Sequence, residues 1–286
     1  MKHRNWSVGN EVSIHGLEWP SNGPLAILLH ANGLCAESWI VVAEKLTERY
    51  RVFALDARGH GGSSSPTPPH AYDWQHFVSD TISVCNQILT ETGYSDFALV
   101  AGSSLGGIIG AAVAADERQL FRRVVMLDPP AFPVERVTQD LEPQKSSIGR
   151  NSIADQARSR RSIWPSRDAA AAAYREKPMF KHWHPTAFDA YLRSGFKDRR
   201  DGDVELACHP EVEASIFELT GSLNIFERAR SVDVPVQLVR ALGGYFPAPL
   251  FEMLAESFPQ CELLSIDGGH LLPVERPDEI TALLLS

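Results

Sequence analysis

The sequence predicts an α/β fold in which a mostly parallel sheet is flanked by helices and a long helical segment is inserted between two strands. The first observation is that short, apolar, strand-like runs alternate with helix-like segments up to about residue 131. This order is typical of a parallel sheet covered on both faces. The second is that no strand-like run occurs between Pro133 and Val232, where the pieces look helical. A chain of 286 residues with 44% hydrophobic residues can also bury one large core.

Each element is predicted from its local pattern. Strands are expected where short apolar runs are bounded by turn residues, at 25–29, 52–55, 97–101, 124–127, 234–240 and 263–266. Helices are expected over 37–47, 74–92, 108–115, 148–161, 168–176, 185–195, 210–219 and 278–285. The alanine run 169–173 favours one inserted helix, and Pro210 stands at the first turn of another. A structureless loop of about a hundred residues would not suit a compact domain.

The run 97–101 leads into the motif Gly-x-Ser-x-Gly, formed by Gly102, Ser104 and Gly106. The helix-like segment 108–115 follows directly. A nucleophile elbow requires this strand–turn–helix context, because its glycines permit a strained turn that raises the serine above the sheet. The five-residue pattern alone is common by chance, so the context is what makes Ser104 the candidate nucleophile.

A nucleophilic serine needs a base, and His270 is the best placed of the ten histidines. It follows the strand-like run 263–266 and the pair Gly268-Gly269, so we expect it on a loop at the edge of the sheet. His60 is the rival. Because the stretch 56–61 looks like a hydrogen-bonded turn after the strand 52–55, we interpret His60 as structural.

Four segments together resemble the α/β-hydrolase-fold serine hydrolases, a family with esterase-like and lipase-like members. The segments are 30–34 (His-Ala-Asn-Gly-Leu), 56–63 (Asp-Ala-Arg-Gly-His-Gly-Gly-Ser), 102–107 (Gly-Ser-Ser-Leu-Gly-Gly) and 268–270 (Gly-Gly-His). Their order and spacing match the family over almost the whole chain. The resemblance implies an α/β-hydrolase core made of 1–132 and 231–286, with 133–230 inserted as a helical cap. Within that cap, 190–196 and 206–214 are similar to a poorly characterised subgroup that includes a fungal peroxisomal lipase.

The resemblance also implies which groups stabilise the transition state. By position, the backbone amides of Asn32 and Leu105 would form the oxyanion hole, with Ala31 in place of a more usual glycine. Backbone N–H groups that are fixed before the reaction stabilise the negative oxygen of a tetrahedral intermediate. The alternative for Asn32 is a plain turn residue whose side chain has no role.

The acidic partner of His270 departs from the family pattern. Most relatives carry an aspartate after the strand 234–240, whereas 241–247 contain no carboxylate. Some members of the fold take their acid from an earlier strand end, which here is Asp128 after the strand 124–127. Ligand-facing groups gather at this carboxyl edge of a parallel sheet, and we therefore predict Asp128 as the acid. A turn-initiating Asp-Pro is the structural alternative, and Glu252 and Asp267 are weaker candidates.

Composition argues against several kinds of partner. A formal net charge of −9 disfavours nucleic acid, whose phosphates would be repelled. No apolar segment is long enough to span a membrane, and the first residues lack the pattern of a signal peptide. The four dispersed cysteines look like reduced core residues. We therefore expect a cytoplasmic protein, as a monomer or homodimer.

No metal or cofactor is expected. His182 and His184 would share a face in an extended stretch, but no carboxylate or cysteine lies at a matching spacing. The glycines of 102–107 follow a strand, as in a phosphate loop or dinucleotide fingerprint, but the Ser104 motif explains them better.

The predicted function is that of a cofactor-independent serine hydrolase acting on a carboxylic ester, lactone or thioester of a small to medium apolar acid. Ser104, His270 and Asp128 would form its catalytic triad. Apolar side chains of the inserted segment, Trp164, Trp183 and Phe188 among them, would line an acyl pocket. The alternative is that they pack the cap against the core.

Other functions stay open at this point. A carbon–carbon bond hydrolase or a perhydrolase uses the same triad, and a ligand-binding receptor would keep a vestigial one. The missing carboxylate after Arg240 is the feature that favours the receptor. Dehalogenases and epoxide hydrolases of this fold are not expected, because they need an aspartate where Ser104 stands.

Overall fold

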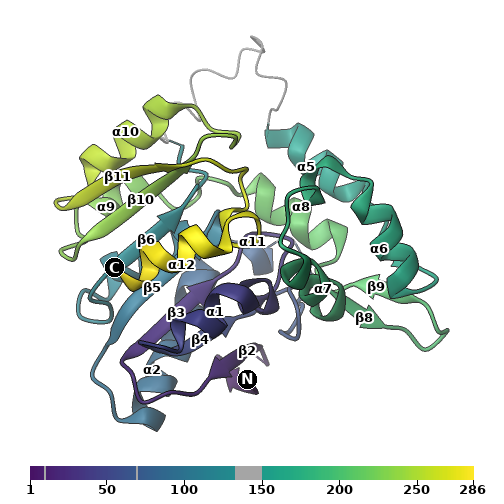
Figure 1. Cartoon of the computed structure of the whole chain (residues 1–286), viewed down its shortest axis with the longest axis horizontal. Helices are drawn as coiled ribbons and strands as arrows, with labels where there is room; N and C mark the ends of the chain where they lie inside the picture. The colour runs from purple at the N-terminus through teal and green to yellow at the C-terminus, as the bar shows by residue number, and fades with distance from the viewer. Residues whose placement is uncertain (10, 69, 133–149) are drawn as a thin grey trace.

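The computed structural model, which describes residues 1–9, 11–68, 70–132 and 150–286, is built on one central sheet of eight strands (Figure 1). Across this sheet the order is β1-β2-β4-β3-β5-β6-β10-β11. Pairing is antiparallel for β1 with β2 and for β2 with β4, and parallel for every other pair. The bounds are β1 Lys2–Ser7, β2 Ser13–Trp19, β3 Leu25–Leu29, β4 Arg51–Leu55, β5 Phe97–Ser103, β6 Val124–Leu127, β10 Val236–Ala241 and β11 Cys261–Ile266. The predicted α/β fold class is confirmed.

Helices cover both faces of the sheet, because its strands are apolar on both sides. Alternate residues of β3 belong to different core clusters: Ala26 and Leu28 to one, Leu25 and Ile27 to the other. The first cluster includes η1 (Ala36–Trp39), α1 (Ile40–Leu46) and α12 (Pro277–Leu285). The second includes α2 (Trp74–Thr92), α3 (Leu105–Asp116), α9 (Ile225–Ala229) and α10 (Ala248–Ser257). Complete burial of each leucine or isoleucine is worth about 1.5–3 kcal/mol, so these two layers hold the sheet rigid.

The part 150–218 of the segment between β6 and β10 is mostly helical and lies to one side of the sheet (Figure 1), whereas α9 belongs to a layer that covers the sheet. Its helices are α5 (Arg150–Arg158), α6 (Arg167–Arg175), η3 (Pro178–Phe180), α7 (Pro185–Ser194) and α8 (Pro210–Glu218). The prediction that this segment contains no strand is wrong. Three short strands form a separate antiparallel sheet in the order β7-β9-β8, with β7 at Ile163–Trp164, β8 at Phe196–Asp198 and β9 at Val204–Leu206. Runs of two or three residues are too short to carry a periodic signal.

Most other predicted elements occur within a few residues of their expected bounds. The helix expected over 74–92 is α2, whereas the first turn of the one expected over 37–47 is the 3-10 helix η1. The sequence does not predict the short helices η2 (His70–Tyr72), η3, α9 and α11 (Leu272–Glu275), or the hairpin of β1 with β2. Residues 133–149, where the predicted cap and its first helix begin, lie outside the described residues.

Within the inserted segment, aromatic rings form a buried cluster around Tyr174. The Tyr174 ring lies 4.7 Å from that of Phe180 and 5.7 Å from that of Trp164, between centroids. Phe180 in turn contacts Trp183 at 4.7 Å and Phe188 at 5.7 Å. The three side chains predicted to line a pocket therefore have ring partners within the inserted segment, and their pocket role stays a prediction.

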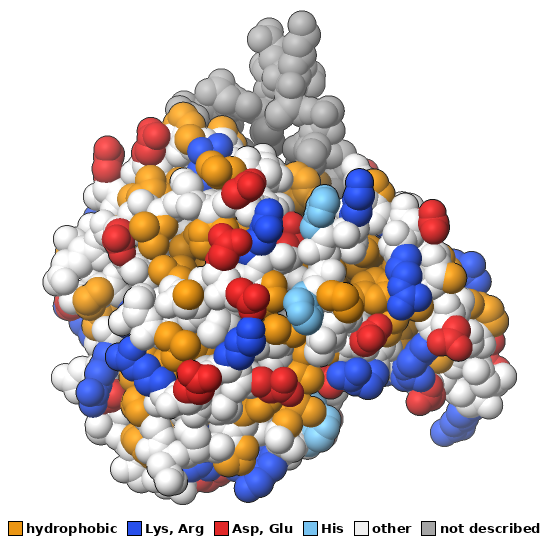
Figure 2. Space-filling view, in the orientation of Figure 1, with side chains coloured by type: hydrophobic (Ala, Val, Ile, Leu, Met, Phe, Trp, Pro, Cys, Tyr) orange, Lys and Arg blue, Asp and Glu red, His pale blue; other side chains and the backbone are white. Residues whose placement is uncertain are grey.

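The surface is mixed in charge. Figure 2 shows acidic and basic side chains interspersed over the face that it draws, with apolar side chains between them. Among the described residues, no helix is both long enough and apolar enough to cross a membrane.

Candidate active site

Ser104 occupies a strained turn between β5 and α3. Its backbone has φ 52° and ψ −117°, which few residues with a side chain adopt. Such strain costs about 1–3 kcal/mol and persists only where the surroundings enforce it. Here the Ser104 N–H donates to the Leu127 carbonyl at 2.8 Å, and the Ser104 carbonyl accepts from the Gly107 N–H at 3.0 Å.

Two glycines of the motif allow the chain to pass close to itself at this turn. A Cβ at Gly102 would lie 2.1 Å from the Gly106 carbonyl oxygen, and one at Gly106 would lie 2.3 Å from the Leu29 carbonyl oxygen. Side chains there would force β5, α3 and β3 apart. The glycines of the Gly-x-Ser-x-Gly motif therefore permit the sharp turn that presents Ser104.

His270 lies between the two side chains that the sequence pairs with it. Its Nε2 is 2.9 Å from Ser104 Oγ, and its Nδ1 is 2.7 Å from Asp128 Oδ2. A carboxylate only accepts hydrogen bonds, so Nδ1 carries the proton and Nε2 is left to accept one from the serine hydroxyl. The structure thus brings Ser104, His270 and Asp128 into one hydrogen-bonded chain, with the geometry of a nucleophile, a base and an orienting acid.

Sheet topology explains why Asp128 reaches His270. β6 lies between β5 and β10, so the carboxyl ends of all three strands meet at the same edge. Asp128 is fully buried, and its second oxygen, Oδ1, accepts the Ala241 N–H at 2.9 Å. A Cβ at Gly244 would lie 2.5 Å from Asp128 Oδ2, so this glycine makes room for the carboxylate. The loop after β10 contains no carboxylate, but it packs against the carboxylate of Asp128, the residue that follows β6.

That same loop supplies aromatic neighbours to His270. The imidazole centroid lies 5.3 Å from the ring of Tyr245 and 5.5 Å from the ring of Phe246. Phe246 meets it edge-on, at an interplanar angle of 79°. Both contacts are within the range of favourable aromatic packing. The sequence prediction did not include these two residues, although they stand in the stretch where a family acid was sought.

The predicted oxyanion groups are the backbone amides of Asn32 and Leu105. In the parts of the chain that the structure describes, no group accepts a hydrogen bond from the N–H of Asn32 or of Leu105. Leu105 is the first residue of α3, where helix geometry leaves N–H groups unpaired. The Asn32 side chain has a separate partner, because its Nδ2 donates to the Glu213 carbonyl at 3.0 Å.

His60 holds the turn that contains Asn32. It is fully buried, its Nδ1 lies 3.0 Å from the Arg58 carbonyl oxygen, and its Nε2 accepts the Gly33 N–H at 3.0 Å. Burial, helped by the nearby His30, lowers the pKa of His60 to about 3. The ring is therefore neutral at ordinary pH and can accept at Nε2. These contacts agree with the structural role predicted for His60.

A second buried carboxylate anchors the stretch 56–63. Asp56 accepts the Ala36 N–H at 2.6 Å and the Gly62 N–H at 2.9 Å, and it lies 2.6 Å from His15 Nδ1. Burial alone would raise the pKa of Asp56, but the hydrogen bond from His15 and the nearby His30 outweigh it, and the pKa is lowered. Asp56 therefore ties β2, the start of η1 and the turn at Gly62 together as a charged group.

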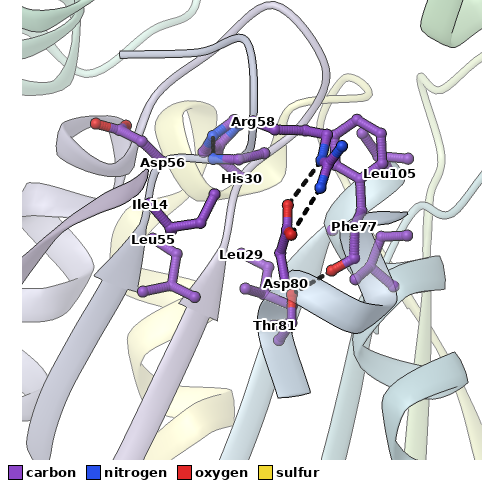
Figure 3. Close-up of a pocket in the computed structure, with 13 residues that line it drawn as sticks. Ile14, Leu29, His30, Leu55, Asp56, Arg58, Phe77, Asp80, Thr81 and Leu105 are labelled. Atoms are coloured by element: carbon purple, nitrogen blue, oxygen red, sulfur yellow. Dashed lines mark hydrogen bonds and ion pairs between the residues drawn. The ribbon is translucent and has the colours of Figure 1, made fainter. Parts of the chain in front are cut away.

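A small cavity lies next to the start of α3 (Figure 3). Apolar side chains such as Leu29, Phe77 and Leu105 line it, together with the buried pair of Arg58 and Asp80, which share two hydrogen bonds of 2.7 Å. None of the residues of the Ser104–His270–Asp128 chain lines this cavity, so it is not the space in which a substrate would meet Ser104.

The weaker candidates lie elsewhere. Glu252 is exposed on α10, and Asp267 is 88% exposed, with Arg276 as its ion-pair partner at 3.9 Å. In the residues that the structure describes, no group of three His, Cys, Asp or Glu side chains is arranged to hold a metal ion.

Comparison with known proteins places the whole architecture among characterised folds. A family model described as alpha/beta hydrolase fold matches residues 24–277. Among curated proteins, fluoroacetate dehalogenase of Burkholderia sp is 34% identical over 110 residues, which cover 37% of this chain and 34% of that protein. The match therefore spans about a third of the length of that relative.

Solved structures resemble the chain over nearly its full length. The crystal structure of E-2-(acetamidomethylene)succinate hydrolase superposes with a TM-score of 0.80 at 19% identity, covering 99% of this chain and 97% of the other. A peroxisomal alpha-beta-hydrolase of Saccharomyces cerevisiae gives a TM-score of 0.74 at 14% identity, covering 99% and 86%. Likeness at such low identity concerns the fold and not the substrate.

Proposed function

The chain belongs to the alpha/beta hydrolase fold family, as its sequence predicts, and on that premise we propose that it is a serine hydrolase. Its substrate would be a carboxylic ester, lactone or thioester of a small to medium apolar acid. The observation that carries the proposal is the hydrogen-bonded chain from Ser104 through His270 to Asp128.

In the proposed mechanism, Ser104 Oγ attacks the substrate carbonyl while His270 Nε2 takes the hydroxyl proton. The oxygen of the tetrahedral intermediate binds the amides of Asn32 and Leu105. Asp128 holds the Nδ1 proton and stabilises the imidazolium, which then gives its proton to the leaving group. Water, deprotonated by His270, attacks the acyl-enzyme and releases the acid.

Three features support these roles. The Ser104 turn is strained in the manner of a nucleophile elbow, and the two amides proposed for the oxyanion hole have no acceptor among the described residues. Asp128 supplies the carboxylate whose absence after Arg240 favoured a vestigial triad. The rings of Tyr245 and Phe246 beside His270 favour an apolar substrate over a charged one.

The similarity to fluoroacetate dehalogenase is not extended to the substrate. It covers little more than a third of this chain, and a serine at position 104 is suited to acyl transfer through an oxyanion. A carbon–carbon bond hydrolase or perhydrolase remains the alternative chemistry for the same side chains. A cytoplasmic location and a monomeric or dimeric state also remain proposals.

Hydrolysis of a substrate panel tests the proposal. Wild-type protein should hydrolyse p-nitrophenyl acetate and butyrate, and the panel of lactones, thioesters and β-diketones should define the class. Ser104→Ala should abolish turnover, whereas Ser103→Ala is the matched control at the adjacent buried serine. Circular dichroism should be unchanged in both variants. A folded Ser104→Ala protein with undiminished turnover would contradict a serine mechanism, and an inert wild type would favour the receptor.

A further inference from the structure

We propose that Glu275 is a positioning residue that fixes the backbone around His270 and so holds the imidazole between Ser104 and Asp128. The inference rests on the proposed function, in which His270 is the base. It concerns a side chain that the triad itself does not include.

The Glu275 carboxylate binds the backbone on both sides of His270. Its Oε2 accepts the Gly269 N–H at 2.7 Å, and its Oε1 accepts the Leu271 N–H at 3.1 Å. Hydrogen bonds to a charged acceptor are roughly twice as strong as hydrogen bonds between neutral groups. The two residues that flank His270 are therefore tied to a single side chain.

Gly269 is the residue that this contact requires. A Cβ at position 269 would lie 2.6 Å from each carboxylate oxygen of Glu275, which is closer than real Cβ atoms approach. Any other residue would push the carboxylate away from the amide. Gly269, directly before His270, thus permits the approach of Glu275.

In the described residues, no Lys, Arg or His lies within ion-pair distance of Glu275. The adjacent Arg276 is directed to other carboxylates, Asp267 and Glu279, each at 3.9 Å. An ordinary surface glutamate would be solvated or paired with a cationic side chain. Both carboxylate oxygens of half-buried Glu275 instead accept hydrogen bonds from the amides next to His270.

The two hydrogen bonds that Glu275 accepts from Gly269 and Leu271, here called the clamp, matter because His270 lies on a loop. Its ring must reach Asp128 at 2.7 Å and Ser104 at 2.9 Å at once. A further hydrogen bond, from the Gly243 N–H to the Gly268 carbonyl at 2.9 Å, holds the start of the loop. Glu275 holds the rest. Misplacement of a catalytic group by about 1 Å can cost a hundredfold in rate, so loss of the clamp should slow the chemical step.

The test is Glu275→Gln, which keeps the size of the side chain but presents an NH2 group to one of the two amides. We expect kcat for an activated ester to fall by about 10- to 100-fold while KM stays within about twofold, because substrate contacts are untouched. We also expect weakening of the low-field proton NMR signal of the His270 Nδ1–H, which depends on the bond to Asp128. Asp267→Asn removes a charge from the same turn without touching an amide, and it should leave both readouts unchanged.

The outcomes separate this inference from the proposed function. If Ser104→Ala is inactive but Glu275→Gln has wild-type kcat and an intact Nδ1–H signal, the positioning role is overturned and the serine mechanism stands. If Ser104→Ala keeps its turnover, the proposed function itself fails. If Glu275→Gln does not fold, Glu275→Asp, which keeps the charge with a shorter reach, should fold and lose about tenfold in kcat. Failure of both variants to fold would make Glu275 a stability residue and overturn the inference.

Discussion

Replacing Asp128 with asparagine should remove the stabilisation of the His270 imidazolium while keeping the size of the side chain. The new Oδ1 can still accept the Ala241 N–H, so the loop after β10 should stay in place. The new NH2 group would face His270 Nδ1 at the position that the carboxylate holds now. Nδ1 would then accept a hydrogen bond and Nε2 would carry the proton, which leaves no lone pair to receive the proton of Ser104.

The size of the effect follows from the geometry. At the 2.7 Å separation of Asp128 Oδ2 and His270 Nδ1, opposite unit charges interact by about 6 kcal/mol at an effective dielectric constant of roughly 20. Since each 1.36 kcal/mol of barrier is tenfold in rate, this corresponds to a loss of about ten-thousandfold in kcat. Removal of the acid from comparable triads has an effect of about that size.

The assay is steady-state hydrolysis of one activated ester by Asp128→Asn, with Glu252→Gln and Asp267→Asn as controls. Both controls remove an exposed carboxylate that has no contact with His270, on α10 and in the turn before His270 respectively, and they should keep wild-type turnover. Thermal unfolding would confirm that each variant is folded. Retention by Asp128→Asn of more than about a tenth of the wild-type rate would refute the reasoning, because the calculated interaction is far larger.

Three further substitutions test separate parts of the site. Gly244→Ala places a Cβ 2.5 Å from Asp128 Oδ2, so ester kinetics should show a loss of at least about tenfold in kcat. An unchanged kcat would mean that the loop after β10 moves to accommodate the Cβ without displacing Asp128. Asn32→Ala keeps the backbone amide but loses the bond to Glu213 and the 3.2 Å contact of Oδ1 with His60 Nε2, so urea unfolding should show about 1 kcal/mol less stability. A hundredfold loss of kcat would instead assign the Asn32 side chain to the oxyanion. His60→Gln should lower the unfolding free energy at neutral pH by about 1–3 kcal/mol. The unfolding free energy of this variant should also change less with pH in the acidic range than that of the wild type. Because the His60 pKa is about 3 in the folded state and about 6.5 when unfolded, the unfolded chain binds the proton first, and wild-type stability falls as the pH drops between these values. Equal pH dependence in urea titrations of both proteins would contradict this.

The parts of the fold that the sequence predicts are those with long or apolar patterns. α2 and the strands β3, β4 and β6 have local signals strong enough to place them. The short strands β7, β8 and β9 have none, because two or three residues pair only when tertiary contacts bring them together. The N-terminal hairpin of β1 and β2 was missed for a related reason, since its polar outer face breaks the apolar run that marks a buried strand.

The candidate site, like the fold, has residues that a local sequence pattern predicts and residues that it does not. Ser104 and His270 stand in local patterns, a strand followed by a glycine-rich turn, that a sequence displays directly. Asp128 is harder, because its contact with His270 depends on β6 lying beside β10, which is a property of the topology. The sequence ranks it above Glu252 and Asp267 because it ends an apolar strand, but the contact itself follows from the strand order. The sequence does not predict the contact of Glu275 with the amides around His270, because a glutamate near a helix start has many possible partners.

Covalent labelling of Ser104 tests the central claim most directly. Wild-type protein would be treated with a fluorophosphonate, and the modified peptide would be identified by mass spectrometry. The proposed mechanism predicts a single adduct on Ser104, absent from Ser104→Ala, greatly slowed in His270→Ala and retained in Ser103→Ala. Folded wild-type protein that takes no label, or an adduct on Ser103 in place of Ser104, would contradict the mechanism.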